Sequence, residues 1–184
     1  MMTSDIQDVL NEQSQNLSAL NMEVTEEDKG SQFLSFDVGG EEFAVDILSV
    51  QEIRGWEQPT YLPNSPVYIK GVLNLRGTIV PVMDLRNRFR FKNAEYSETT
   101  VIIILKVTQS DKERLMGCVV DGVSDVFNIE ESEITEVPDY GSGVDSRFTA
   151  GVMTVEDHAV TLLELSNLLS LELIDHPYTG VSNG

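Results

Sequence analysis

The side chains that most often do chemistry in proteins are scarce in this chain. It holds two histidines, His158 and His176, and a single cysteine, Cys118. The histidines fall in different predicted elements with no cysteine pair nearby, so the sequence supports neither a zinc site nor a histidine-activated nucleophile. Cys118 lies in a predicted strand, where a cysteine is usually a small buried apolar side chain. We therefore expect no metal, no cofactor and no enzymatic activity.

Acidic side chains are abundant, but their arrangement does not favour acid–base catalysis. Adjacent carboxylates such as Glu41/Glu42 and Glu130/Glu131 are usually solvated in a chain this acidic. No glycine-rich loop leads from a predicted strand into a helix, so a phosphate cradle is not expected either. The net charge is −19, from 31 acidic and 12 basic residues, and it argues against nucleic acid or an anionic membrane as the partner.

The best candidate for recognition of another protein is an arginine in a predicted turn. Arg76 lies between two apolar strands and is bracketed by Gly71 and Gly77. Its planar, weakly hydrated guanidinium is the kind of group that dominates protein interfaces. Glu52, on the preceding predicted strand, can orient that guanidinium through a charge-assisted hydrogen bond. The pattern therefore favours a binding surface built around Arg76 over a merely solvated turn.

A second basic feature is the cluster Arg86, Arg88, Arg90 and Lys92, the only positive patch on this acidic chain. On a helix such a cluster is usually a solvated face. It can equally steer an acidic partner toward the surface, and the sequence leaves both interpretations open.

These candidates lie within an internal repeat whose copies are eighty positions apart. YIKGVLNLRGTIVPVMDLRNRF, from Tyr68, aligns without a gap with FTAGVMTVEDHAVTLLELSNLL, from Phe148. The upstream flanks match as well, so one supersecondary unit is used twice. The copies differ most where Arg76-Gly77 becomes Glu156-Asp157.

The elements that position these residues are short strands with glycine and proline turns. A strand is predicted over 32–38, followed by a tight turn at Gly39-Gly40. Pro81 must lie where its strand lacks a partner on one side, and Asp84 can cap a short helix. A closing amphipathic helix is predicted over 164–173. This pattern indicates an all-β barrel or sandwich, and the repeat indicates two barrels.

Composition divides the chain into a domain with two tails. Residues 1–30 read as an acidic, mobile N-terminal tail, and residues 174–184 as a short C-terminal tail. The domain spans 31–173, with two intertwined barrel subdomains at roughly 40–98 and 99–173 and the first strand shared. The longest apolar run, Val101 to Leu105, is too short to span a bilayer, and no secretory signal pattern is present. We expect a cytoplasmic protein.

Four stretches in order and spacing, at 45–55, 69–77, 79–86 and 119–126, resemble the CheW family of chemotaxis coupling proteins. The resemblance covers about 32–169. It implies an all-β fold of two pseudo-symmetric five-stranded SH3-like β-barrels with short helices, and a non-enzymatic adaptor or scaffold in signal transduction.

The resemblance also implies partners. Such an adaptor couples the cytoplasmic tip of methyl-accepting chemoreceptors to the regulatory domain of the histidine kinase CheA, in arrays at the inner face of the membrane. It would be a monomer by itself, would form rings with the kinase, and would not touch the membrane. A receptor groove between the barrels, shaped by the Glu52–Arg76 pair, would be edged by Val50, Glu52, Gly71, Arg76, Val123 and Val126. The motifs single out no residues for the kinase contact.

Two alternatives remain open. A paralogue of the same family can serve a non-flagellar chemosensory pathway that controls pili or a second messenger. An unrelated ligand-binding or enzymatic barrel would instead show a deep polar pocket with a perturbed titratable group.

Overall fold

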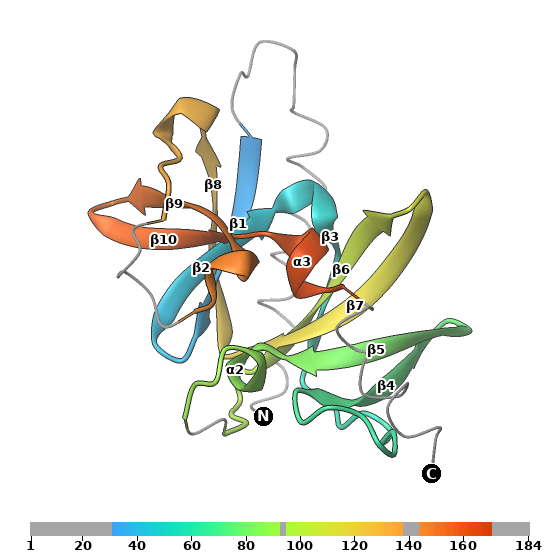
Figure 1. Ribbon diagram of the computed structural model, residues 1–184. Coiled ribbons are helices and arrows are strands. Elements are labelled where there is room, and N and C mark those ends of the chain that lie inside the picture. The colour runs from blue at the N-terminus through green and yellow to red at the C-terminus, as the bar shows by residue number, and fades with distance from the viewer. Residues whose placement is uncertain (1–30, 93–94, 138–143, 171–184) are drawn as a thin grey trace.

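The computed structural model describes residues 31–92, 95–137 and 144–170, and the part of the chain that it describes is built almost entirely of strands (Figure 1). The predicted all-β class is therefore confirmed. Two short helices, α2 and α3, each follow a strand. The strands are β1 (Ser31–Val38), β2 (Glu41–Asp46), β3 (Val50–Gly55), β4 (Ile69–Leu75), β5 (Thr78–Asp84), β6 (Val101–Gln109), β7 (Lys112–Val120), β8 (Gly122–Ile129), β9 (Thr149–Val155) and β10 (His158–Leu163); the helices are α2 (Leu85–Arg88) and α3 (Leu165–Leu168).

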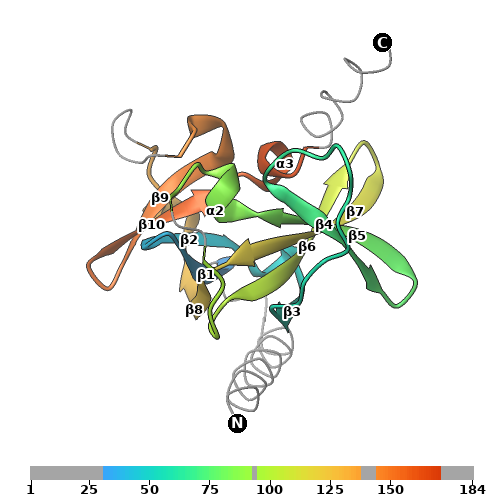
Figure 2. The same ribbon diagram turned by 90° about the horizontal axis from the view of Figure 1, so that it is seen from below.

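The strands form two five-stranded sheets with the same internal plan. One, the first barrel, has the order β3-β6-β7-β5-β4, and the other, the second barrel, has the order β8-β1-β2-β10-β9. In each, a parallel pair joins two antiparallel groups, β5 with β7 and β10 with β2. Seen from below (Figure 2), β1 and β6 lie in the middle, with the β4–β5 and β9–β10 hairpins at opposite ends. The repeat in sequence is thus a repeat in structure.

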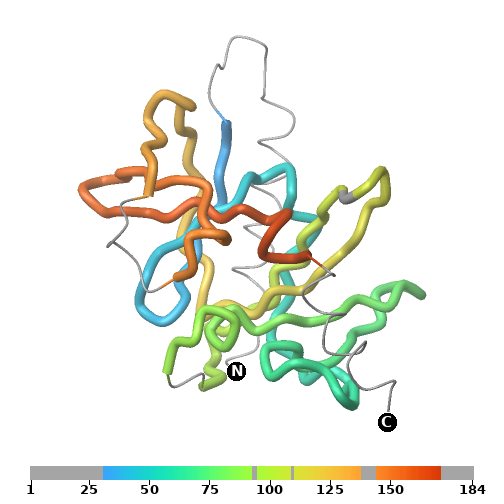
Figure 3. Tube along the Cα trace, in the orientation of Figure 1, coloured from blue at the N-terminus to red at the C-terminus, as the bar shows by residue number. Residues whose placement is uncertain are grey.

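The sheets divide the chain differently from the predicted subdomains at 40–98 and 99–173. The first barrel is continuous, from β3 to β7, whereas the second combines β1 and β2 with β8, β9 and β10. The reason is that β3 follows the β1–β2 hairpin in sequence but pairs with β6. Likewise, β8 follows the β6–β7 hairpin but pairs with β1. The trace in Figure 3 follows the first of these crossings, from β2 to β3. The exchanged strands intertwine the barrels, so the ends of the sequence repeat are not the ends of the sheets.

The largest apolar core lies between the barrels and takes side chains from both. Alternation along a strand sends successive side chains to opposite faces. On β6, Ile103 and Leu105 enter this shared core, as do Leu34 and Phe36 of β1. Ile102 and Ile104 point the other way, into a smaller core inside the first barrel. The second barrel has its own small core around Phe33, Ala44, Met153 and Val160. Both faces of β6 are therefore buried over residues 101–105, which explains the uninterrupted apolar sequence of that part of the strand.

Several local predictions are confirmed. Gly39 and Gly40 have φ values of 62° and 84°, as a tight hairpin turn requires. The Asp84 carboxylate accepts a hydrogen bond from the Arg86 backbone N–H at 3.0 Å and caps α2. Pro81 lies just before the parallel ladder of Val82–Asp84 with β7, where β5 has a strand neighbour on one side only.

Other predictions are corrected or lie outside the described residues. The closing helix is a single turn, Leu165–Leu168, and residues after 170 are outside the described part. The hairpin at 109–114 turns on Ser110 and Asp111, both with positive φ, because the strands extend further than the polar composition indicates. The predicted tails at 1–30 and 174–184, and with them His176, also lie outside the described residues.

Candidate protein-interaction site

The Arg76-Gly77 turn has a backbone conformation that few residue pairs adopt easily. Arg76 has a φ of 52° and Gly77 a φ of 90°, both in the left-handed region. The Asn74 side-chain oxygen accepts the Gly77 N–H at 2.9 Å and stabilises the turn. An arginine held at positive φ costs backbone energy, so the turn presents this side chain at a conformational cost.

The Arg76 side chain is 82% exposed and is oriented by an acidic partner from another strand. Its Nη2 donates to Glu52 Oε2, so the pair predicted from the sequence is present. The other oxygen of Glu52 accepts from Arg54 Nη1 at 3.3 Å, and Arg54 Nη2 donates to Glu57 Oε1 at 3.1 Å. These alternating charges join β3 to the β4–β5 turn. Because the network is exposed, its value lies in orienting the guanidinium more than in stability.

The three valines of the predicted site each pack on the shared core. Val50, Val123 and Val126 are half-buried and pack against the core between the barrels. Val50 lies opposite Leu105, and Val123 opposite Phe36, so the exchanged strands β3 and β8 carry them at matching places. Each of these ladders contains a bulge beside the valine. These three valines, here called the apolar edge, come from strands of both barrels.

Gly71 has a role that is different from lining a groove. It is buried, with a φ of 143°, and a Cβ built on it would lie 2.1 Å from the backbone oxygen of Thr60. Directly beside it, Thr60 and Val72 exchange two backbone hydrogen bonds of 2.9 Å. Gly71 thus lets the loop before β4 cover the free edge of that strand, which keeps the β4–β5 hairpin in place.

Two clefts among the described residues lie elsewhere. One, of about 320 Å³, opens between β5 and β7. The other, of about 510 Å³, lies where η1 (Ile47–Ser49) and β6 face β10 and α3. Neither is lined by any of the six residues predicted for the receptor site. The six predicted residues therefore lie apart from both clefts.

Sequence reasoning missed a buried ionic cluster at α2. The Arg86 side chain is 2% exposed and Asp84 is fully buried. The guanidinium binds Asp84 with two bonds, Nε to Oδ1 at 3.0 Å and Nη2 to Oδ2 at 2.9 Å, and also lies 5.0 Å from the ring centroid of Tyr96. Burial by itself would lower the pKa of Arg86, but the hydrogen bond and charge of Asp84 outweigh it and raise the pKa.

Asp121 links this cluster to the other barrel. Its Oδ1 accepts from Arg86 Nη1 at 3.0 Å, and its Oδ2 accepts the Gly39 N–H at 2.6 Å in the turn between β1 and β2. The Asp121 backbone N–H in turn donates to the backbone oxygen of Asp37 at 2.9 Å. The one sequence signal for the cluster is that Arg86 matches Ser166 in the repeat, a mismatch like that at Arg76.

The fold divides the basic cluster of the sequence, because Arg90 and Lys92 are exposed whereas Arg86 and Arg88 are not. Arg86 is buried in ion pairs, and Arg88 is half-buried between two rings, 4.4 Å from the centroid of Tyr68 and 4.5 Å from that of Phe148. Desolvation lowers the pKa of Arg88. Because one arginine lies in the fold's interior and another is half-buried across the two barrels, both serve the arrangement of the barrels.

The remaining candidates for chemistry are placed as follows. His158 is exposed at the start of β10. Cys118 is a free, fully buried thiol, and burial raises its pKa. Within the described ranges, no three His, Cys, Asp or Glu side chains are grouped so as to hold a metal ion, and no helix is long and apolar enough to cross a membrane.

Two intertwined five-stranded barrels that share a core and display an oriented arginine define a double SH3-like binding protein. A family model described as CheW-like domain matches residues 32–173. The chain is 42% identical over 143 residues to a chemotaxis protein CheW of Klebsiella aerogenes, covering 78% of this chain and 84% of that protein. It is 38% identical over 143 residues to the chemotaxis protein CheW of Rhizobium meliloti, with 78% and 90% covered.

The fold agrees with these relatives. The crystal structure of the scaffolding protein TtCheW from Thermoanaerobacter tengcongensis superposes with a TM-score of 0.69 at 29% identity, covering 77% of this chain and 93% of that one. The chain belongs to the CheW family. It is thus a chemotaxis adaptor or scaffold, and not an enzyme.

Proposed function

We propose that this adaptor couples the cytoplasmic tip of methyl-accepting chemoreceptors to the regulatory domain of CheA. Membership of the CheW family supports the coupling role. The observation that carries the choice of surface is the Glu52–Arg76 pair, which orients an 82% exposed guanidinium between β3 and the β4–β5 turn. The partners themselves rest on the family resemblance.

The receptor surface in this proposal consists of the oriented arginine and the apolar edge. A receptor helix end would pack on Val50, Val123 and Val126, which both barrels hold against their shared core. Arg76 would contact polar groups of the receptor, with Glu52 holding its geometry. Gly71 contributes by keeping the β4–β5 hairpin closed at Thr60. Activity is then a matter of geometry, since a receptor shift changes how the kinase domain sits on the same rigid scaffold.

The kinase contact in this proposal lies at the end of the first barrel. Tyr61 and Val67, in the loop between β3 and β4, are 75% and 74% exposed, and Leu62 beside them is 38% exposed. Large apolar side chains gathered in one exposed loop favour burial against another protein. A contact at a barrel end leaves the central edge free for the receptor, so both partners can bind at once and assemble into arrays beside the membrane.

The test is a reconstituted receptor–kinase assay with two matched variants. Arg76→Ala removes the oriented guanidinium from a solvent-exposed position, so we expect kinase activation to fall about fivefold or more with little change in Tm. Glu156→Ala, at the corresponding turn of the second barrel, should leave activation unchanged. If the Arg76→Ala variant activated the kinase as fully as the unchanged protein, the proposed surface would be refuted. A pull-down with candidate receptors would then separate a swimming pathway from a paralogous one that controls pili or a second messenger.

A further inference from the structure

The cleft of about 510 Å³ carries two carboxylates. It lies where η1 and β6 face β10 and α3, and the half-buried side chains of Asp46 and Glu164 line it. Asp46 Oδ1 accepts the Leu48 N–H at 2.9 Å. Glu164 Oε1 accepts the Ser166 N–H at 3.3 Å. These bonds hold both carboxylates in place, and each carboxylate keeps a second oxygen for a further donor.

The basic side chains around this cleft are engaged elsewhere. Among the described residues that line it, Lys106 is the only base, and its Nζ lies 3.8 Å from Glu113 Oε1 on β7. Arg147 lies against α3, since its backbone oxygen accepts from Asn167 Nδ2 at 3.0 Å, but its guanidinium binds Asp145. No described lysine or arginine forms an ion pair with either carboxylate of the cleft.

The matching place in the first half of the chain is occupied by a guanidinium. In the repeat, Glu164 corresponds to Asp84, and Ser166 corresponds to Arg86. The Arg86 guanidinium binds Asp84 with two hydrogen bonds of 3.0 and 2.9 Å, and its Nη1 binds Asp121 at 3.0 Å. A serine is too short to fill the space that this arginine fills, so the second half has an open cleft at the matching place.

The strand registers show that the two places correspond. The exchanged strands β3 and β8 carry Val50 and Val123 at matching positions, each beside a bulge. Leu48 and Asp121 lie two residues before these valines, and the ladders of β2 with β1 and of β7 with β6 give the same alignment. Leu48, which lines the cleft, is therefore the counterpart of Asp121, which holds Arg86.

The second half differs from the arginine site in one carboxylate position and keeps the number of carboxylates. Where the first half has Asp121, the second has Leu48, which is 74% exposed. Asp46 supplies the other carboxylate instead, beside Glu164. A large apolar side chain that is exposed at the edge of a charged cleft favours burial against another protein over binding of a free ion.

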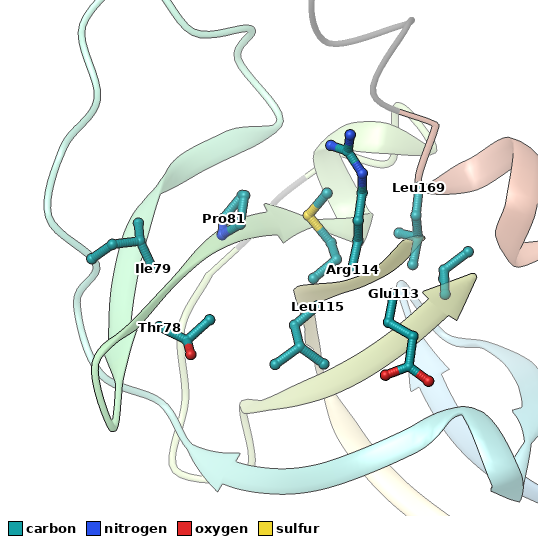
Figure 4. Close-up of a pocket in the computed structure, with 9 residues that line it drawn as sticks. Thr78, Ile79, Pro81, Glu113, Arg114, Leu115 and Leu169 are labelled. Atoms are coloured by element: carbon teal, nitrogen blue, oxygen red, sulfur yellow. The ribbon is translucent and has the colours of Figure 1, made fainter. Parts of the chain in front are cut away.

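The cleft between β5 and β7 has different chemistry. Its described lining side chains include one acid and one base, Glu113 and Arg114, and apart from Thr78 the others are apolar (Figure 4). Because the two charges balance, this cleft does not select a cation. A pair of carboxylates therefore distinguishes the larger cleft.

We propose that the cleft lined by Asp46 and Glu164 binds an arginine side chain of a partner protein, at the place that matches the Arg86 site. Its planar guanidinium binds Glu164 as Arg86 binds Asp84, with Asp46 as the second negative charge. Its aliphatic stem lies against Leu48. All seven arginines of this chain are among the described residues, and none pairs with these carboxylates, so the arginine comes from another molecule.

This surface is additional to the one proposed for receptor coupling, because none of the six residues predicted for that surface lines the cleft. The apolar loop proposed for the kinase contact does not line it either. The inference therefore adds a third binding surface, one that selects its partner by charge and by the shape of a guanidinium.

Amide NMR spectra of the full chain, titrated with N-acetyl-arginine amide, test this recognition. The matched control is the citrulline analogue, which has nearly the same shape and no charge. We expect the arginine probe to shift the amide signals of Leu48 and Ser166, which donate to the two carboxylates. Half-saturation should come below about 10 mM, and at a concentration about tenfold lower than with the citrulline analogue.

Three results of this titration would overturn the proposal. One is the absence of shifts at Leu48 and Ser166, or equal shifts with both probes. Another is tighter binding of free arginine than of the amide, because the amide mimics a residue within a protein chain. The third is a shift of the same signals when the protein concentration alone is raised, which would assign the cleft to a second copy of this chain.

Two pairs of variants locate the binding. Glu164→Gln removes the charge and keeps an oxygen that can cap α3, so we expect probe binding to weaken about fivefold or more. Glu156→Gln, which removes the same charge from an exposed turn, should leave it unchanged. Ser166→Arg supplies a guanidinium from the chain itself and should abolish the shifts, whereas Asn167→Arg at the exposed neighbouring position should not.

Equal binding by Glu164→Gln and Glu156→Gln, or undiminished binding by Ser166→Arg, would refute the site. All of these positions are exposed or half-buried, so the variants should fold. Neither receptor nor kinase is present in the titrations, and a failure here is therefore distinct from a failure of the proposed coupling surface.

Discussion

The β4–β5 and β9–β10 hairpins have nearly the same backbone and different side-chain chemistry. Both central residues of each turn have positive φ: 52° and 90° at Arg76 and Gly77, 48° and 67° at Glu156 and Asp157. In each half, a loop threonine exchanges two backbone hydrogen bonds with the strand, Thr60 with Val72 and Thr135 with Val152. The first turn nevertheless displays a paired arginine, whereas among the described residues the carboxylates of the second form no ion pair. Duplication has kept the geometry, and the polar side chains have been free to differ.

The region around the two short helices shows the same contrast in the interior. Asp84 and Glu164 both cap a helix, with backbone N–H groups of Arg86 and Ser166 as donors at 3.0 Å and 3.3 Å. In the first half, Arg86 fills the interior with ion pairs to Asp84 and Asp121. In the second, Ser166 and Glu164 line an open cleft of about 510 Å³. The first half therefore carries both the exposed arginine and the buried one.

The largest expected effect is on the buried arginine. Arg86→Ala leaves the fully buried Asp84 carboxylate without its bidentate partner, so we expect a loss of about 3–5 kcal/mol in the free energy of unfolding. The matched change Ser166→Ala, at an exposed position, should cost within about 0.5 kcal/mol. Urea denaturation measures both. If the two variants were equally stable, the contrast between the helix regions would be wrong.

An intermediate effect is expected at the glycines beneath the covering loops. Gly71→Ala meets a backbone oxygen at 2.1 Å and a positive φ, so we expect a cost of about 3 kcal/mol and faster amide exchange at Val72. Gly151→Ala meets Ile134 Cγ2 at 2.5 Å and the Thr135 backbone oxygen at 2.9 Å, but Gly151 is not among the glycines with a positive φ, so we expect a smaller loss of about 1–2 kcal/mol. Denaturation and hydrogen exchange distinguish them. A larger loss at Gly151 would reverse this part of the comparison.

The smallest expected effect is on the turns themselves. Asp157 has a φ of 67°, so Asp157→Gly should relieve strain and stabilise the protein by about 0.5 kcal/mol. The reverse change, Gly77→Asp at a φ of 90°, should destabilise by about 1 kcal/mol. Paired thermal melts of the two variants suffice. A stabilising Gly77→Asp would show that the turns are not conformational equivalents.

Much of the fold was predictable because its signals are local. Alternating apolar residues, the Gly39-Gly40 turn and the Asp84 cap each specify a short stretch of backbone, and all three are present. The division into sheets was not predictable from the repeat. Whether β3 pairs with the preceding β1–β2 hairpin or with β6 depends on contacts between distant segments. Such contacts produce no periodic pattern in the sequence.

The candidate site was predictable in part. The Glu52–Arg76 pair was inferred from charge and turn chemistry, and it is present. The role of Gly71 was not inferred, because the Thr60 carbonyl beneath it belongs to a loop with no regular ladder. Arg86 was grouped with its basic neighbours, since the sequence alone cannot tell a solvated arginine from one enclosed by Asp84 and Asp121.

The sequence by itself determined the duplicated all-β unit, its turns and caps, and the arginine that distinguishes one copy from the other. Those features depend on residue types and spacings within a few positions of one another. Only the tertiary structure decided which strands are exchanged, that Asp121 joins Arg86 to the turn at Gly39, and that Val50 and Val123 pack against one core. Burial and ion pairing depend on which residues from distant parts of the chain lie next to a side chain. Those neighbours are determined only when the two barrels pack around their common core.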